Sequence, residues 1–259
     1  MISYVIIFIL ISLIFSIVFL EQKAITGEAR KRNRRRWPAH FALFMIAIGI
    51  QMMLPIGAAS AAIFAKSNGY GVINWLNIPV GFASILSFLT LSLTSYLLHF
   101  AMHKIPLLWR LHQVHHSDYE LDITTSYRTH PIAVVITLGV IFTIVCLLGP
   151  LPEIVLFYSL IVLLINFFHH SSLAWPKWVE NTLAKIIITS SQHHIHHSNY
   201  QPETDSNYSV DLCVWDKLFG THLKEPIRTN EKFAYGLKQI SPTEAVDLHA
   251  ILSSPFKRK

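Results

Sequence analysis

Residues 99–116 read H-F-A-M-H-K-I-P-L-L-W-R-L-H-Q-V-H-H and contain five histidines. Within this stretch His99 and His103 are four residues apart, and so are His112 and His116, with His115 beside them. Residues four apart project from the same side of an α-helix, so each pair directs two imidazoles toward one point. The stretch therefore predicts a metal site whose ligands stand on helices.

Further histidines follow the same pattern later in the chain. The spacing H-x-x-H-H of residues 112–116 recurs at 193–197, and His169 and His170 lie between the two occurrences. One metal ion offers four to six positions, so a larger set of imidazoles favours two metal ions. Neutral imidazole suits iron, zinc and copper, and the spacing alone leaves the metal open. The candidate ligands are His99, His103, His112, His115, His116, His170, His193, His196 and His197.

Composition indicates a membrane protein. The 259 residues are 52% hydrophobic and only 14% charged, and the mean hydropathy is +0.43; a soluble domain carries far more charge. The formal charge of +6 is concentrated in residues 30–36. Between two apolar segments such a basic run predicts a cytoplasmic anchor, and without interleaved aromatic residues it does not indicate nucleic-acid binding. Cys146 and Cys213 form no metal-binding or redox spacing.

Five apolar stretches predict four to five transmembrane helices. Residues 2–20 predict a retained helix with an external N-terminus, and spans at about 41–65, interrupted by Pro55 and Gly57, and at about 72–98 follow it. Residues 132–148 and 154–168 predict a helical hairpin, because Gly149-Pro150-Leu151-Pro152 separates them. This parity places every histidine cluster on the cytoplasmic face. The expected fold is all-α, a polytopic membrane protein with a histidine-rich helical cap.

Three segments follow from this organisation. Residues 1–98 are expected to hold N-terminal transmembrane helices and the basic loop, residues 99–221 the histidine-rich catalytic region, and residues 222–259 a polar cytoplasmic tail. Side chains without a pattern receive simpler interpretations. His40, His222 and His249 are expected at the surface or an interface; Asp118, Glu120 and Asp122 are expected in a solvated loop, with a role behind the ligands as the alternative.

Taken together, the histidine spacings carry a resemblance to a known family. H-x-x-x-H at 99–103 and H-x-x-H-H at 112–116 and 193–197 resemble the three histidine boxes of the membrane fatty acid hydroxylase and sterol desaturase superfamily, in a bacterial-type form. The flanks agree: Leu108-Trp109-Arg110, Arg128-Thr129-His130-Pro131, Asn207-Tyr208 and Trp215-Asp216-Lys217-Leu218-Phe219-Gly220-Thr221. The resemblance covers about residues 99–221.

This resemblance implies a non-haem di-iron oxygenase at the cytoplasmic face of a bacterial inner membrane. Such an enzyme uses O2 and two electrons to hydroxylate, or desaturate, an acyl-chain or sterol-like lipid. Hydroxylation is the favoured hypothesis. All nine candidate histidines become ligands to two iron ions. Asn166, four residues before His170, is expected to reach the site directly or through water. His130 is expected either to donate a hydrogen bond behind the ligands or to pack beside Pro131 at a helix start. Asp216 is expected to stabilise a turn in the tail, with orientation of a ligand histidine as the alternative.

Electrons are expected from a separate donor, a ferredoxin or a b-type cytochrome with its reductase. The chain carries no fused b-type cytochrome motif, because His130-Pro131 is followed by Ile132-Ala133 rather than by glycines.

A non-redox membrane zinc protein is the alternative. A zinc transporter would place polar or histidine ligands near the bilayer midplane, and these spans contain almost none. A zinc hydrolase would show a general base such as the glutamate of H-E-x-x-H, which is absent from the sequence. Both absences favour the oxygenase.

Overall fold

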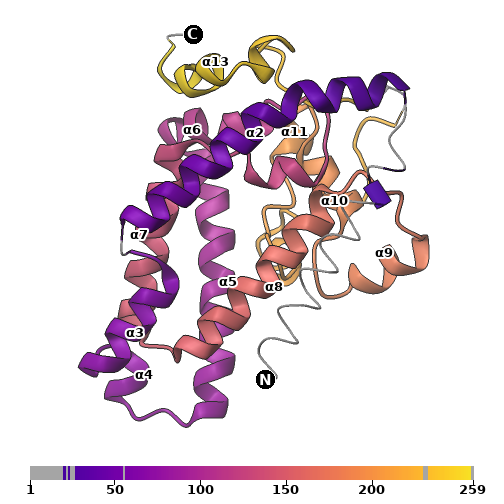
Figure 1. The fold of residues 1–259 in the computed structure, drawn as a ribbon. Coiled ribbons are helices and arrows are strands. Elements are labelled where there is room, and N and C mark those ends of the chain that lie inside the picture. Colours follow the sequence, from indigo (N-terminus) through magenta and orange to yellow (C-terminus); the bar gives the residue numbers. More distant parts are fainter. Residues whose placement is uncertain (1–19, 22, 24–26, 55, 230–232, 258–259) are drawn as a thin grey trace.

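The computed structural model describes residues 20, 21, 23, 27–54, 56–229 and 233–257, and within them the fold is all-α (Figure 1). No β-strand forms in these residues, so the predicted fold class is confirmed. The α-helices are α2 (Gly27–Met53), α3 (Ala58–Asn68), α4 (Val72–Trp75), α5 (Val80–Lys104), α6 (Pro106–His116), α7 (Pro131–Leu148), α8 (Pro152–His170), α9 (Lys177–Leu183), α10 (Ser190–His196), α11 (Gln201–Thr204), α12 (Val214–Phe219) and α13 (Leu248–Ser253). Short 3₁₀ helices are η1 (Ile123–Tyr127), η2 (Glu244–Val246) and η3 (Ser254–Phe256).

Four helical segments among the described residues are long and apolar enough to cross a membrane: residues 31–75, 80–104, 131–148 and 152–170. Helix α2 ends at Met53 and α3 begins at Ala58, on either side of the Pro55 and Gly57 positions that were expected to interrupt the span. The hairpin of α7 and α8 is present as predicted. Except for Leu20, the predicted first span at residues 2–20 lies outside the described residues.

A small apolar core joins α3, α5, α7 and α8. Its fully buried members include Ala61 and Ala62 of α3, Leu91 of α5 and Val145 of α7. Because alanine side chains are short, α3 can approach the hairpin closely, which is how helices pack inside a bilayer. This bundle holds α5 and α8, two of the helices that carry histidines in their last turn.

Two glycines close the end of the bundle away from the histidines. Gly149 ends α7 with φ +72°, and Gly71 before α4 has φ +97°. A Cβ atom added at Gly71 would lie 2.3 Å from the backbone nitrogen of Gly149. The turn after α3 and the turn of the hairpin therefore meet with room only for glycine.

The basic run belongs to the first half of α2, which crosses the top of the bundle in Figure 1. Arg36 is 3% exposed, and its guanidinium bonds both carboxylate oxygens of Asp118 at 2.7 and 2.8 Å. The prediction of a solvated acidic loop is therefore wrong for Asp118 and Asp122, which are 2% and 0% exposed. His40 is also buried rather than at the surface, because it packs beside Asp118 at 3.3 Å.

The C-terminal segment folds back onto the cap. Ile251 of α13 packs in one apolar cluster with Ala39 and Leu43 of α2 and Val114 of α6. Helix α13, which lies in the region predicted as a polar tail, thus packs against α6, the helix that carries His112, His115 and His116 (Figure 1).

Candidate metal centre

Each of four helices brings histidines to the site at its C-terminal end. His99 and His103 lie in the last turns of α5, His112, His115 and His116 end α6, His170 ends α8, and His193 and His196 lie in α10, followed by His197. Pro106 starts α6 immediately after α5, and a capping box of Thr189 and Gln192 starts α10. The C-terminus of a helix carries partial negative charge, so four converging C-termini favour bound cations.

The nine predicted histidines form two groups. His99, His103, His112, His116 and His196 make up one, which we call the five-histidine group. His115, His170, His193 and His197 make up the four-histidine group. Within each group one nitrogen per residue lies within 4.8 Å of all the others. Every pair at four-residue spacing shares a group, and the groups adjoin where the rings of His116 and His197 stack at 4.5 Å.

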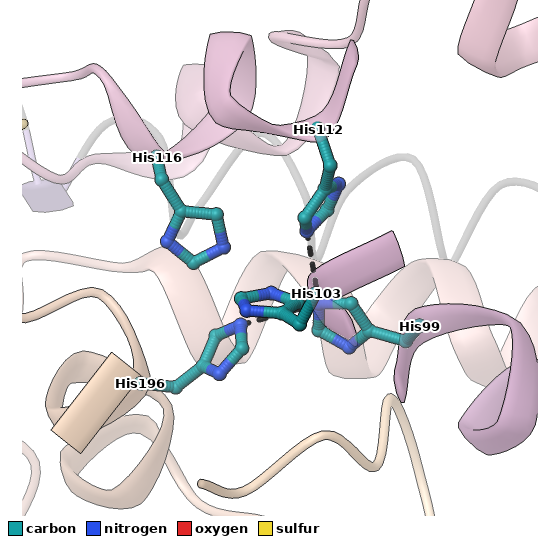
Figure 2. A group of neighbouring side chains, drawn as sticks. All are labelled: His99, His103, His112, His116 and His196. Carbon is teal, nitrogen blue, oxygen red and sulfur yellow. Dashed lines mark hydrogen bonds between the residues drawn. The ribbon is translucent and has the colours of Figure 1, made fainter. Parts of the chain in front are cut away.

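Backbone carbonyls fix the protonation of two rings in the five-histidine group. The Nδ1 atom of His99 lies 2.6 Å from the carbonyl oxygen of Tyr208, and that of His196 lies 2.7 Å from the carbonyl of Ser206. A carbonyl only accepts, so in the neutral rings Nδ1 carries the hydrogen and Nε2 carries a lone pair. Yet the two Nε2 atoms lie 3.2 Å apart (Figure 2).

Lone pairs facing each other at this distance repel unless a cation lies between them. Nitrogens bound to one metal at about 2.1 Å and at right angles lie roughly 3 Å apart, which fits this spacing. Figure 2 shows His112 and His116 approaching from α6 toward the other three rings. Among the residues that the structure describes, neither ring nitrogen of His103 or His116 has a hydrogen-bond partner. The donor set therefore fits a metal ion.

The four-histidine group repeats this arrangement. His170 Nδ1 lies 2.9 Å from the carbonyl oxygen of Asn166, which leaves its Nε2 as a lone pair. That Nε2 lies 3.1 Å from Nε2 of His193 and 3.3 Å from Nε2 of His115. His197 Nε2 lies 3.2 Å from Nε2 of His193. The group thus fits a second metal ion.

Burial keeps these imidazoles neutral. The nine rings are at most 9% exposed. For the six outside the apolar spans, burial lowers the pKa well below its usual value, and neighbouring histidines lower it further; they are His112, His115, His116, His193, His196 and His197. Neutral imidazole is the form that binds metal.

The carboxylate of Asp216 supports His99 through the backbone. Its two oxygens accept the backbone N–H groups of Tyr208 at 2.8 Å and Ser209 at 2.9 Å, and Asp216 is fully buried. This fixes the Tyr208 carbonyl that bonds His99. Asn207 precedes with φ +50°, a left-handed conformation that asparagine tolerates better than most residues. The Asn207-Tyr208 and Trp215–Thr221 flanks therefore build one loop behind the five-histidine group.

Two other predicted supporting residues stand differently. Asn166 contacts His170 through its backbone carbonyl, while its side-chain nitrogen donates to the carbonyl of Val162. His130 caps α7 by accepting the Ile132 N–H, and its other nitrogen bonds the carbonyl of Leu252. The structure thus places His130 at a helix start and a tail contact.

Sequence reasoning missed the role of Arg128, a buried residue that bonds the C-terminal end of α6. Arg128 is 0% exposed; its Nε bonds the carbonyl of Val114 and its Nη2 bonds Ser117 Oγ, both at 2.7 Å. Arg128 thereby clamps the last turn of α6, which carries His115 and His116. A cue was present, because Arg128 belongs to a flank that the resemblance singled out, but its target is a backbone atom that no side-chain pattern reveals.

A cavity of about 490 Å³ extends from the histidines into the apolar bundle. His99 and His112 of one group and His115, His170 and His193 of the other line it. Its walls come mainly from α5, α7 and α8 and include Leu91, Leu98, Met102, Ile141, Val155 and Val162. Both groups therefore face one mostly apolar space that lies between membrane-type helices.

Comparison with known proteins gives the family. A sequence model named "Fatty acid hydroxylase" matches residues 84–221, more than half of the chain. The chain belongs to the fatty acid hydroxylase family. The matched segment begins within α5 and contains all nine candidate ligand histidines.

Similar proteins include alkylglycerol monooxygenase of Homo sapiens, 30% identical over 153 residues, which are 58% of this chain and 32% of that protein. Ornithine lipid hydroxylase OlsE of Rhizobium tropici is 26% identical over 214 residues, 82% of this chain and 61% of that protein. Very-long-chain aldehyde decarbonylase GL1-5 of Oryza sativa subsp. indica is 26% identical over 183 residues, 67% and 28% of the two chains. The chain thus spans about a third of the length of the alkylglycerol monooxygenase. No solved structure matches it.

Proposed function

We propose that this chain is a membrane-bound, O2-dependent lipid hydroxylase that holds two iron ions in the five- and four-histidine groups. The observation that carries the proposal is that both groups present lone-pair nitrogens to one apolar cavity between membrane-type helices. Relatives named as an alkylglycerol monooxygenase and an ornithine lipid hydroxylase support an oxygenation of lipids. The ligands would be the nine histidines, with Asn166 and Asp216 supporting them from behind.

Bound iron would supply the chemistry that the side chains lack, namely reduction of O2 and attack on an unactivated carbon–hydrogen bond. The polypeptide would do the rest. The apolar walls would hold a lipid chain and exclude water, and Asp216 and Arg128 would keep the ligand rings in position. His99, His112, His115, His170 and His193, which line the cavity, would set where along the lipid the reaction occurs.

A lipid would enter from the bilayer, because the cavity lies among the apolar helices. Two electrons would come from a separate ferredoxin or b-type cytochrome with its reductase. We place the histidine cap at the cytoplasmic face of a bacterial inner membrane, since a basic run beside an apolar span marks that side.

The test is metal content of detergent-purified protein, paired with the mass change of host lipids incubated with and without O2. About two irons per chain and a lipid that gains one oxygen are expected; loss of two hydrogens would indicate desaturation. Stoichiometric zinc, with no lipid change after iron, O2 and reductant are supplied, would contradict the proposal and favour the non-redox zinc protein.

A further inference from the structure

Helix α12 packs against α5 on the membrane side of the histidines. The indole nitrogen of Trp215 donates to Ser92 Oγ at 2.7 Å, and the ring of Phe219 stacks on that of Tyr96 with centroids 5.2 Å apart. Ser92 precedes His99 by seven residues, which is about 10 Å along the helix axis. Both α5 residues lie in the apolar stretch that is expected to end near residue 98. Helix α12 therefore lies beside the membrane-type part of α5.

The outer face of α12 is apolar and exposed. Val214, Leu218 and Phe219 are 47%, 67% and 51% exposed, and the first two share one helical face because they are four residues apart. The adjoining segment adds Ile186, 64% exposed, whose carbonyl oxygen accepts the Cys213 N–H at 3.0 Å. We call Ile186, Val214, Leu218 and Phe219 the α12 patch. Large apolar side chains gathered on a surface mark a site of interaction.

The exposed charges beside the α12 patch are basic. In residues 183–188 and 211–220, Asp211 and Asp216 are fully buried, whereas Lys185 and Lys217 are exposed. Lysines at the edge of an apolar surface can keep their methylene stems in apolar surroundings while the ammonium groups reach water or phosphate. The cytoplasmic leaflet of a membrane carries anionic headgroups. The side chains thus match the boundary between headgroups and acyl chains.

We propose that the α12 patch inserts into the cytoplasmic leaflet of the bilayer that surrounds α5. The position beside Ser92 and Tyr96 favours lipid over a soluble partner, because such a partner would meet the headgroups before it reached this depth. Helix α12 also carries Asp216, whose carboxylate holds the Tyr208 N–H in the loop behind His99. One helix would therefore contact lipid and support the five-histidine group. This inference rests on the proposed function only for the membrane location of α5.

Photo-crosslinking of the full chain in nanodiscs tests the insertion. The photoreactive amino acid p-benzoylphenylalanine, which forms bonds to nearby C–H groups, replaces Leu218 or, in a second variant, Ile186; mass spectrometry of the intact protein detects lipid adducts. Leu89 of α5, 42% exposed, is the lipid-facing reference. His249 is the reference in water, because it is exposed on α13, which lies above α2 in Figure 1. Adducts at both patch positions should form in a yield comparable to that at Leu89, with none at His249.

A lipid adduct at Leu89 with none at Leu218 or none at Ile186 would overturn the inference. So would a crosslinked dimer at either patch position, because a second copy of the chain would then cover the patch. Absence of adducts at Leu89 as well would contradict the membrane location that the proposed function assumes. Lipid adducts at the patch of iron-loaded protein that oxidises no lipid would contradict the proposed function and leave this inference standing.

Discussion

The Nε2 atoms of His99 and His196 lie 3.2 Å apart, although each ring donates from Nδ1 to a backbone carbonyl oxygen. No hydrogen is left to join these two nitrogens, so the contact is unfavourable unless they share a cation. Histidine pairs of the four-histidine group show the same spacing.

Removing one ligand from each group should release one metal ion at a time. His103→Ala in the five-histidine group and His193→Ala in the four-histidine group should each lower the metal content from about two ions per chain to about one, because each group fits one ion. Elemental analysis of purified protein measures this. His249→Ala changes an exposed histidine and should retain both ions; loss of metal there would mean that the assay reports unfolding.

Replacing Asp216 should weaken one metal site without touching a ligand. Asp216→Asn places an amide hydrogen against one of the two backbone N–H groups that the carboxylate accepts, so the Tyr208 carbonyl that holds His99 should shift. Changes at groups that orient ligands typically cost 10–100-fold, so we expect roughly that loss in affinity for one of the two ions. Titration with a competing chelator measures it. Asp247→Asn alters a carboxylate that caps α13 and should leave both affinities unchanged; equal losses in the two variants would refute the role of Asp216.

Breaking the buried ion pair between Arg36 and Asp118 should destabilise the histidine-rich cap. Arg36→Met leaves the Asp118 carboxylate buried without its bidentate partner, which should lower the free energy of unfolding by about 3–5 kcal/mol. Denaturation in detergent is the measurement.

The matched control for this pair is Arg32→Met. Arg32 pairs with Glu120 at the surface, where the two side chains are 55% and 32% exposed. Surface pairs contribute about 0–1 kcal/mol, so this variant should be nearly neutral. Similar losses of unfolding free energy in both variants would show that the buried pair stabilises the protein no more than the surface pair does.

Packing at the far end of the bundle should not tolerate a side chain. Gly71→Ala would bring a Cβ to 2.3 Å from Gly149 N at a positive φ, so unfolding free energy should fall by about 1–3 kcal/mol. Gly139→Ala is the comparison, because its Cβ would meet nothing within 4 Å; alanine also suits a helix better, and stability should hold or rise. An unchanged unfolding free energy in Gly71→Ala would mean that the two turns can move apart at little cost.

Local spacing predicted much of the site. Helical pairs such as His112 and His116 were expected to share a metal, and they do fall in one group. His115, three residues after His112, projects toward the other group, so one box serves both groups. The pairing of boxes across the sequence depends on how α5, α6, α8 and α10 pack, and no spacing within one box contains that information.

Contacts to backbone atoms and long-range ion pairs escaped the sequence. The carbonyls of Ser206 and Tyr208 that bond His196 and His99 belong to every residue type, so side-chain identity cannot mark them. Arg36 looked like one more member of a basic run, yet it lies against Asp118, 82 residues later. A run of basic residues predicts that most of them are exposed to solvent. One of them can be buried only where a residue distant in the sequence compensates its charge.

The most direct test of the central claim follows the oxygen atom. Purified iron-loaded protein, in nanodiscs of host lipid and supplied with a chemical reductant, is exposed to isotopically labelled O2, and the lipids are examined by mass spectrometry. We expect one labelled oxygen in a lipid product, formed by wild-type protein and lost in His103→Ala and His193→Ala. Product oxygen that comes from water, or a labelled lipid formed equally by both variants, would contradict an oxygenase centred on the two histidine groups.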